Sequence, residues 1–197
     1  VSLRALGQLY LSQQNVDEAL RAMEECLVMA RVRQERLPEN DEVSNLVLLL
    51  ILQLSTLYFQ QEDFEGVISL LEEAVVLQKE RGEDVALSLN NLGLANERKG
   101  NLIKALLYYQ ELLQLRREGN DPIRSAESMV TCAKILERSR RTHDAMALYH
   151  EALAIYQQTP QLYSALIAEI MVRTSSLGVP VYSESLMTMH SDDNDRA

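Results

Sequence analysis

Small and large apolar positions recur along the chain in a fixed order that predicts paired helices. Four times, a small residue follows a Leu or a Cys, and a second small or β-branched residue comes twelve positions later. A large apolar residue follows after four more positions, and a further apolar or small residue three beyond that. The columns are Leu6-Gly7, Leu54-Ser55, Leu92-Gly93 and Cys132-Ala133; Ala19, Val67, Ala105 and Ala145; Met23, Leu71, Tyr109 and Tyr149; and Cys26, Ala74, Leu112 and Ala152. Because residues three and four apart share one helix face, each unit predicts two helices that meet at the small residues.

These units predict an all-α fold, an α-solenoid of stacked antiparallel helix pairs. A single helix pair leaves an apolar face exposed, so the units stack on one another. We expect four pairs within residues 1–159, at about 1–35, 42–82, 84–118 and 122–158. A capping helix at 160–176 and an irregular acidic tail at 177–197 follow. The first helix begins at Val1 without an N-cap residue, so we expect further repeats to precede it.

The first unit carries the residues of a known repeat. Leu6-Gly7-x-x-Tyr10, followed by Ala19-x₃-Met23, resembles the signature of the tetratricopeptide repeat (TPR). The chain has no Trp, and Asn96 and Leu136 replace the Tyr of the first helix in later units. The unit spacings of 48, 38 and 40 residues resemble the long repeats of kinesin light chains and Pins-type adaptors. The resemblance implies a TPR superhelix whose concave groove binds a peptide.

Charge and composition exclude some classes of partner. The chain of 197 residues has a net charge of −10, and nucleic-acid binding requires a basic surface, so we expect no nucleic-acid partner. The most apolar run, Leu46–Leu52, is far shorter than the roughly 20 residues of a membrane span, so we expect a buried helix and no membrane partner. The two cysteines, Cys26 and Cys132, are not in a metal-binding spacing and suit a reducing compartment, which favours a cytoplasmic protein.

Residues with catalytic or metal-binding chemistry do not converge in the sequence. His143 and His150 share a helix face two turns apart, which is too far for a common metal ligand set, and His190 lies in the tail. The acidic run Ser191–Asp195 lacks the Gly and the distal Glu of a calcium loop. Phosphate-binding and dinucleotide-binding glycine motifs are missing. We therefore expect no enzyme activity, no metal and no cofactor.

The resemblance to TPR proteins places candidate binding residues on the first helix of each unit. Gln53 and Asn91 precede the Leu-small pair, where an amide can both donate to and accept from a peptide backbone. The competing interpretation is that these amides bond within the scaffold. Lys134, Arg138, Arg140 and Arg141 form the one basic cluster, which is either an acidic-peptide contact or a solvated helix end. The candidate groove residues are Arg4, Gln8, Gln53, Thr56, Asn90, Asn91, Leu94, Glu97, Lys134 and Arg138.

The leading hypothesis is a non-enzymatic adaptor that binds a peptide or helical segment of a partner protein in this groove. The alternative is self-association, or a structural role in a larger complex, suggested by the uncapped first helix and the apolar segment Val47–Leu52. A third hypothesis has the acidic segment Ser183–Ala197 fold back onto Lys134–Arg141 and compete with partners. The sequence identifies neither the partner nor the oligomeric state.

Overall fold

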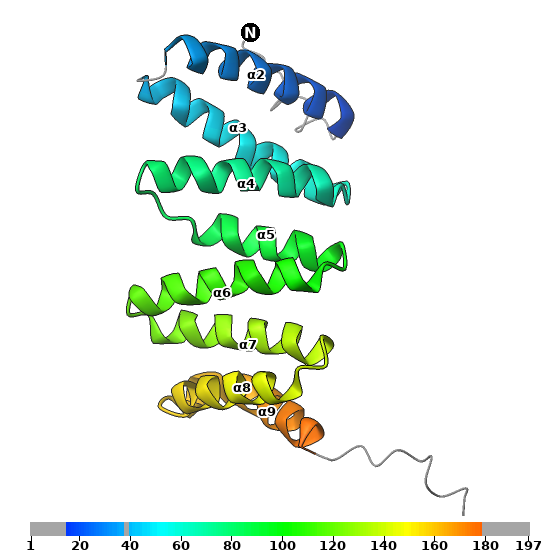
Figure 1. Ribbon diagram of the computed structural model, residues 1–197, viewed down its shortest axis with the longest axis vertical. Coiled ribbons are helices and arrows are strands. Elements are labelled where there is room, and N and C mark those ends of the chain that lie inside the picture. The colour runs from blue at the N-terminus through cyan, green and yellow to red at the C-terminus, as the bar shows by residue number, and fades with distance from the viewer. Residues whose placement is uncertain (1–14, 38–39, 179–197) are drawn as a thin grey trace, which may run out of the picture.

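The computed structural model describes residues 15–37 and 40–178, which form a stack of eight helices and no strand. Figure 1 shows the helices following one another along the long axis of the molecule. This arrangement confirms the predicted all-α solenoid. The first expected helix, with Arg4 and Gln8, and the tail after Gly178 lie outside the described residues. The helices are α2 (Val16–Arg36), α3 (Asp41–Gln60), α4 (Phe64–Glu80), α5 (Ala86–Arg98), α6 (Leu102–Glu118), α7 (Pro122–Arg138), α8 (Thr142–Tyr156) and α9 (Pro160–Leu177).

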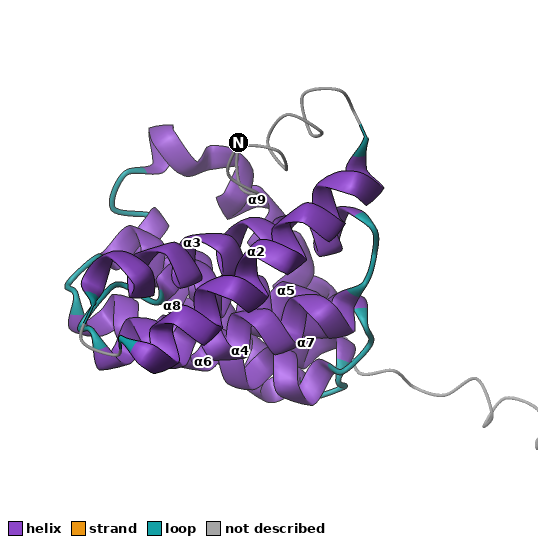
Figure 2. Ribbon diagram, turned by 90° about the horizontal axis from the view of Figure 1, so that it is seen from above, coloured by secondary structure: helices purple, strands orange, loops and turns teal. Residues whose placement is uncertain are grey.

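Each helix packs against the next one in the chain, from α2 to α9. Seen along the stack, the connecting turns alternate between two edges, so that successive helices run antiparallel (Figure 2). The pairs α3–α4, α5–α6 and α7–α8 correspond to the second, third and fourth sequence units. Helix α9 has a non-helical residue, Tyr163, near its start, and its Ile170 is buried in the core cluster that α6, α7 and α8 form.

The small residues of the repeat lie where the two helices of a pair touch. Gly93 on α5 faces the ring of Tyr109 on α6, and a Cβ atom on Gly93 would lie 2.4 Å from Cε1 of that ring. Ala105 on α6 and Ala133 on α7 are fully buried. Tyr149 on α8 is also fully buried. The alternation of a small and a large side chain therefore sets the distance between paired helices, as the sequence pattern predicts.

Helix α3 is long and apolar enough to cross a membrane by length and composition alone. In the described structure it lies between α2 and α4, and Val47, Leu50 and Ile51 are fully buried in a core cluster with residues of both neighbours. The apolar segment Val47–Leu52 is thus a core element, so it does not supply the free apolar surface that would motivate self-association.

The turns inside the helix pairs repeat a left-handed backbone conformation. Glu62, Gly100 and Arg140 each lie seven residues after the small residue of their unit, with φ angles of 60°, 84° and 60°. The next residue is the N-cap of the second helix. The side chains of Asp63 and Asn101 accept a hydrogen bond from the backbone N–H three residues later, whereas the N-cap of α8 is an arginine that makes no such bond. The α7–α8 turn therefore combines an unfavourable left-handed residue with a missing cap.

Replacing Arg140 by Gly and Arg141 by Asn copies the Gly100-Asn101 turn into the α7–α8 pair. We expect the free energy of unfolding to rise by about 1–2 kcal/mol, because glycine tolerates positive φ and asparagine supplies the missing acceptor. The substitution also removes the exposed ion pair of Arg141 with Asp144 (2.6 Å), which contributes little. Urea denaturation followed by circular dichroism measures the change.

The matched control is Gly100→Arg, which places a side chain in the same conformation where no atom lies within 4 Å of the new Cβ. It should lower stability by about 1 kcal/mol through the backbone alone. Equal stabilities of all three proteins would contradict the assignment of strain to this turn position.

Candidate functional site

Side-chain contacts join alternate helices of the stack into two rows. The first row connects α5, α7 and α9, and the second connects α2, α4, α6 and α8. We call the surface of α3, α5 and α7 the first-helix face, because these are the first helices of their pairs. The contacts of the first row are Arg138–Glu97, Lys134–Glu169 and Arg173–Glu137; those of the second are Arg31–Glu73, Lys79–Glu111 and Arg117–Glu151.

A tyrosine, a glutamate and an arginine form a repeated relay within the first row. The hydroxyl of Tyr149 on α8 donates to Oε2 of Glu137 on α7 at 3.0 Å. The same carboxylate accepts from Nη1 of Arg173 on α9 at 3.1 Å. One unit earlier, Tyr109 donates to Glu97 at 3.2 Å, and Arg138 of the next unit pairs with Glu97. Each relay therefore ties a helix pair to the helix that follows it in the chain.

Burial and these contacts set the protonation states along the row. Burial, with the adjacent Glu137 and Glu97, raises the pKa of Tyr149 and of Tyr109 above its usual value, so both hydroxyls remain donors at neutral pH. Hydrogen bonds from Lys134 and Arg173 lower the pKa of Glu169, which stays ionised. The charged side chains of the first row are thus paired with one another and do not form a patch of unpaired charge.

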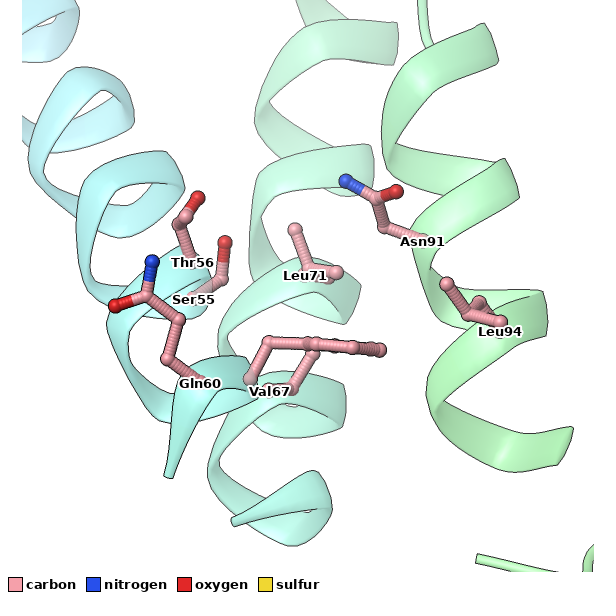
Figure 3. Close-up of a pocket in the computed structure, with 8 residues that line it drawn as sticks. Ser55, Thr56, Gln60, Val67, Leu71, Asn91 and Leu94 are labelled. Atoms are coloured by element: carbon pink, nitrogen blue, oxygen red, sulfur yellow. The ribbon is translucent and has the colours of Figure 1, made fainter. Parts of the chain in front are cut away.

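The relay is replaced by apolar residues at α3 and α4. Phe59 occupies the position of Glu97 and Glu137, and Leu71 occupies the position of Tyr109 and Tyr149. A pocket of about 220 Å³ opens here between α3, α4 and α5. Figure 3 shows the side chains of α3 and α5 on either side of it, with α4 between them. Its lining residues are Ser55, Thr56, Phe59, Gln60, Val67, Leu71, Asn91 and Leu94.

Two amides accompany this pocket. Asn91 lines it from α5, and Gln53 occupies the same repeat position on α3. The Oε1 atom of Gln53 is buried and has no hydrogen-bond partner among the residues that the structure describes. A buried acceptor without a donor costs free energy, but Gln53 does not line the pocket, so this atom does not by itself mark a ligand contact.

The predicted groove residues divide into two groups. Thr56, Asn91 and Leu94 line the pocket together, while Gln53 and Asn90 lie half-buried on the same two helices. The second group consists of paired charges. Glu97, Lys134 and Arg138 are all held by ion pairs between helices.

The predicted basic cluster is not a free cationic surface. Lys134 pairs with Glu169 at 2.9 Å, Arg138 pairs with Glu97, and Arg141 pairs with Asp144 at 2.6 Å. These pairs favour the interpretation of the cluster as a solvated helix end over an acidic-peptide contact. Glu169 and Glu97 were not apparent as partners from the sequence, because they lie on other helices, whereas Asp144 lies only three residues after Arg141.

The pocket also contains residues that were not among the predicted groove positions. Val67 and Leu71 occupy core columns of the repeat, and Gln60 ends α3. The signal that could have revealed the pocket is the change from Glu and Tyr to Phe59 and Leu71 in two columns of one unit.

Groups with reactive chemistry are inert or dispersed in the described part of the chain. Burial raises the pKa of the Cys132 thiol to about 12, so it is protonated at neutral pH. No three His, Cys, Asp or Glu residues between 15 and 178, outside the gap at 38–39, are placed to hold a metal ion.

Comparison with known families agrees with the repeat pattern. Residues 1–32 and 84–158 each match a tetratricopeptide repeat family, and together these ranges cover more than half of the chain. The chain belongs to the tetratricopeptide repeat family. No curated protein matches this TPR chain.

Solved structures resemble the TPR stack. BtubC (BKLC) from P. vanneervenii is 21% identical, with a TM-score of 0.63 over 89% of this chain and 70% of that one. A putative kinesin light chain with nearly identical TPR-like repeats from Podosopora anserina is 16% identical, with a TM-score of 0.59 over 96% of both chains. Aspartyl phosphate phosphatase F from Bacillus subtilis is 12% identical, with a TM-score of 0.63 over 89% of this chain and 44% of that one. At these identities the likeness shows the fold alone.

The family gives the coarse function. TPR repeats are generally non-catalytic protein-interaction units, which indicates that this chain binds protein partners.

Proposed function

We propose that the chain is a non-enzymatic adaptor that binds an extended segment of a partner protein on its first-helix face. The segment places one apolar side chain in the pocket between α3, α4 and α5. The observation that carries the proposal is this pocket, which opens where the relay of the third and fourth units is replaced by Phe59 and Leu71. We place the adaptor in the cytoplasm, because Cys26 and Cys132 are both free thiols.

The size and lining of the pocket support an apolar anchor. An enclosed apolar site of about 150 Å³ holds benzene, so about 220 Å³ accommodates a leucine or phenylalanine side chain. Burial of such a side chain contributes roughly 1.5–3 kcal/mol. Phe59, Val67, Leu71 and Leu94 supply the apolar walls, and Thr56 and Asn91 supply polar groups at the same site.

The Asn91 amide favours an extended segment over a helical one. The N–H groups within an α-helix are already bonded to its own carbonyl groups, whereas an extended backbone presents free N–H and C=O groups. Asn91, which lines the pocket, can both donate to and accept from such a backbone. Lys134 and Arg138 are already paired with carboxylates of the chain. An acidic ligand, including the acidic tail of the chain itself, would have to compete with these carboxylates.

Selection from a phage-displayed library of random peptides tests the proposal, followed by fluorescence polarisation with the selected peptides. We expect them to share one apolar residue. Leu94→Lys should weaken their binding by roughly tenfold or more, since it removes an apolar wall worth over 1.4 kcal/mol. Asn91→Thr should weaken binding by about fivefold through the loss of a hydrogen bond.

The repeat itself shows that these variants are compatible with folding. Lys134 occupies the position of Leu94 in the fourth unit, and Thr131 occupies the position of Asn91. The matched control is Leu107→Lys, which changes an exposed leucine on α6 and should leave binding unchanged. Wild-type affinity of the folded Leu94→Lys protein would overturn the proposal.

A further inference from the structure

The ion pairs of the first row fix the alignment of α9 with the first helices of the repeat. Arg173 on α9 pairs with Glu137 on α7, as Arg138 on α7 pairs with Glu97 on α5. Lys134 and Glu169 pair between equivalent positions of α7 and α9. With this alignment, each α9 residue lies 35 positions after its counterpart on α7.

This alignment shows that α9 carries the pattern of a first helix. Ile167-Ala168 falls in the column of Leu92-Gly93 and Cys132-Ala133. Ile170 falls in the column of Ile135, and both are buried against the preceding helices. Helix α9 is therefore the first helix of a fifth unit, rather than only a polar cap on the fourth.

The surface that receives the second helix in the other units is open on α9. Leu136 on α7 is 2% exposed beneath α8, whereas its counterpart Met171 is 52% exposed. Ala133 is fully buried, whereas its counterpart Ala168 is exposed. The described residues end at Gly178, directly after α9, and contain no helix that covers this surface. Figure 1 shows α9 at the end of the stack, next to α8.

The open surface of α9 carries no charge. The two charged residues of the helix, Glu169 and Arg173, are both paired with α7. What remains exposed is apolar or small. We call this surface the α9 outer face; it consists of Ser164, Ala165, Ala168, Met171, Val172 and Ser175.

We propose that a second copy of this chain docks on the α9 outer face, so that each α9 serves as the missing second helix of the other copy. The second helix of a pair is antiparallel to the first, and a two-fold axis perpendicular to α9 makes two copies of α9 antiparallel. Two copies of a chain with a net charge of −10 repel each other, and the uncharged α9 outer face allows contact without opposing like charges.

The spacing of the outer face suits this symmetry. Ser164, Ala168, Met171 and Ser175 are separated by four, three and four positions, so the order is the same from either end. An antiparallel pair places Ala168 opposite the partner's Met171, and Ser164 opposite the partner's Ser175. A small residue then meets a large one, as Gly93 meets Tyr109 inside the α5–α6 pair.

Sedimentation equilibrium of the full chain over a wide concentration range tests this interface. We expect a monomer–dimer equilibrium in the wild-type chain. Met171→Glu should raise the dimer dissociation constant at least tenfold, because it introduces like charges at the two-fold axis. Ile103→Glu, which adds the same charge at an apolar residue of α6 that is 78% exposed, should leave the equilibrium unchanged.

Cysteine cross-linking tests the pairing of residues. Under oxidising conditions a mixture of the Ser164→Cys and Ser175→Cys proteins should form a disulfide-linked heterodimer in higher yield than either protein alone. A chain that stays monomeric at all concentrations, as it would if its own residues after Gly178 covered the face, overturns the proposal. A dimer that Met171→Glu does not weaken also overturns it. The groove proposal is independent of either result.

Discussion

Replacing Gly93 by serine is expected to destabilise the protein by about 2 kcal/mol, despite the better helix propensity of serine. A Cβ atom at this position would lie 2.4 Å from Cε1 of Tyr109 and 2.7 Å from Cδ1 and Cζ. The tyrosine ring is 3% exposed and held between two helices, so the helices themselves must move apart. Urea denaturation followed by circular dichroism measures the loss.

The second unit suggests the compensating change. There Ser55 and Leu71 occupy the positions of Gly93 and Tyr109, and both are buried. We expect Gly93→Ser combined with Tyr109→Leu to be more stable than the sum of the two single changes indicates. Strict additivity in this double-mutant cycle would show that the two side chains do not determine the spacing of α5 and α6.

The second large effect concerns Tyr149, which is fully buried between α7 and α8. Tyr149→Ala should lower the free energy of unfolding by about 4 kcal/mol, because it leaves a cavity of aromatic size in the core. Thermal and urea denaturation measure this change.

The control Tyr149→Phe keeps the ring and removes the hydroxyl that donates to Glu137 at 3.0 Å. It should cost only about 1 kcal/mol, because Glu137 retains its contact with Arg173. If the two variants lose equal stability, the hydrogen bond rather than the packing would dominate at this position.

The fold class was predictable because helix pairing depends on local side-chain size. Gly93 and Ala105 lie twelve residues apart, and both belong to one pair whose contact they determine. The helices from α3 to α8 follow directly from such columns. The open face of α9 was less apparent, because Ile167-Ala168 lies only 35 residues after Cys132-Ala133 and no second-helix column follows it in the pattern.

The candidate site was predictable only in part. Thr56 and Leu94 share one repeat position and Asn91 lies one turn before Leu94 on α5, and all three line the pocket. The pairing of Arg138 with Glu97 spans 41 residues. It depends on how one unit packs on the next, and the residue pattern within a single helix does not predict this packing. A pocket, moreover, forms only where neighbouring side chains fail to fill space, so it depends on all the lining residues together.

The Tyr–Glu–Arg relay is present in only some units, so neighbouring first helices are joined by two kinds of contact. The α5–α7 and α7–α9 joints hold partly exposed ion pairs, which dissolved salt weakens. The joint between α3 and α5 is formed around apolar walls, which salt does not weaken and cooling loosens. A segment bound in this joint would therefore stiffen the place among the described first helices where no ion pair joins one of them to the next.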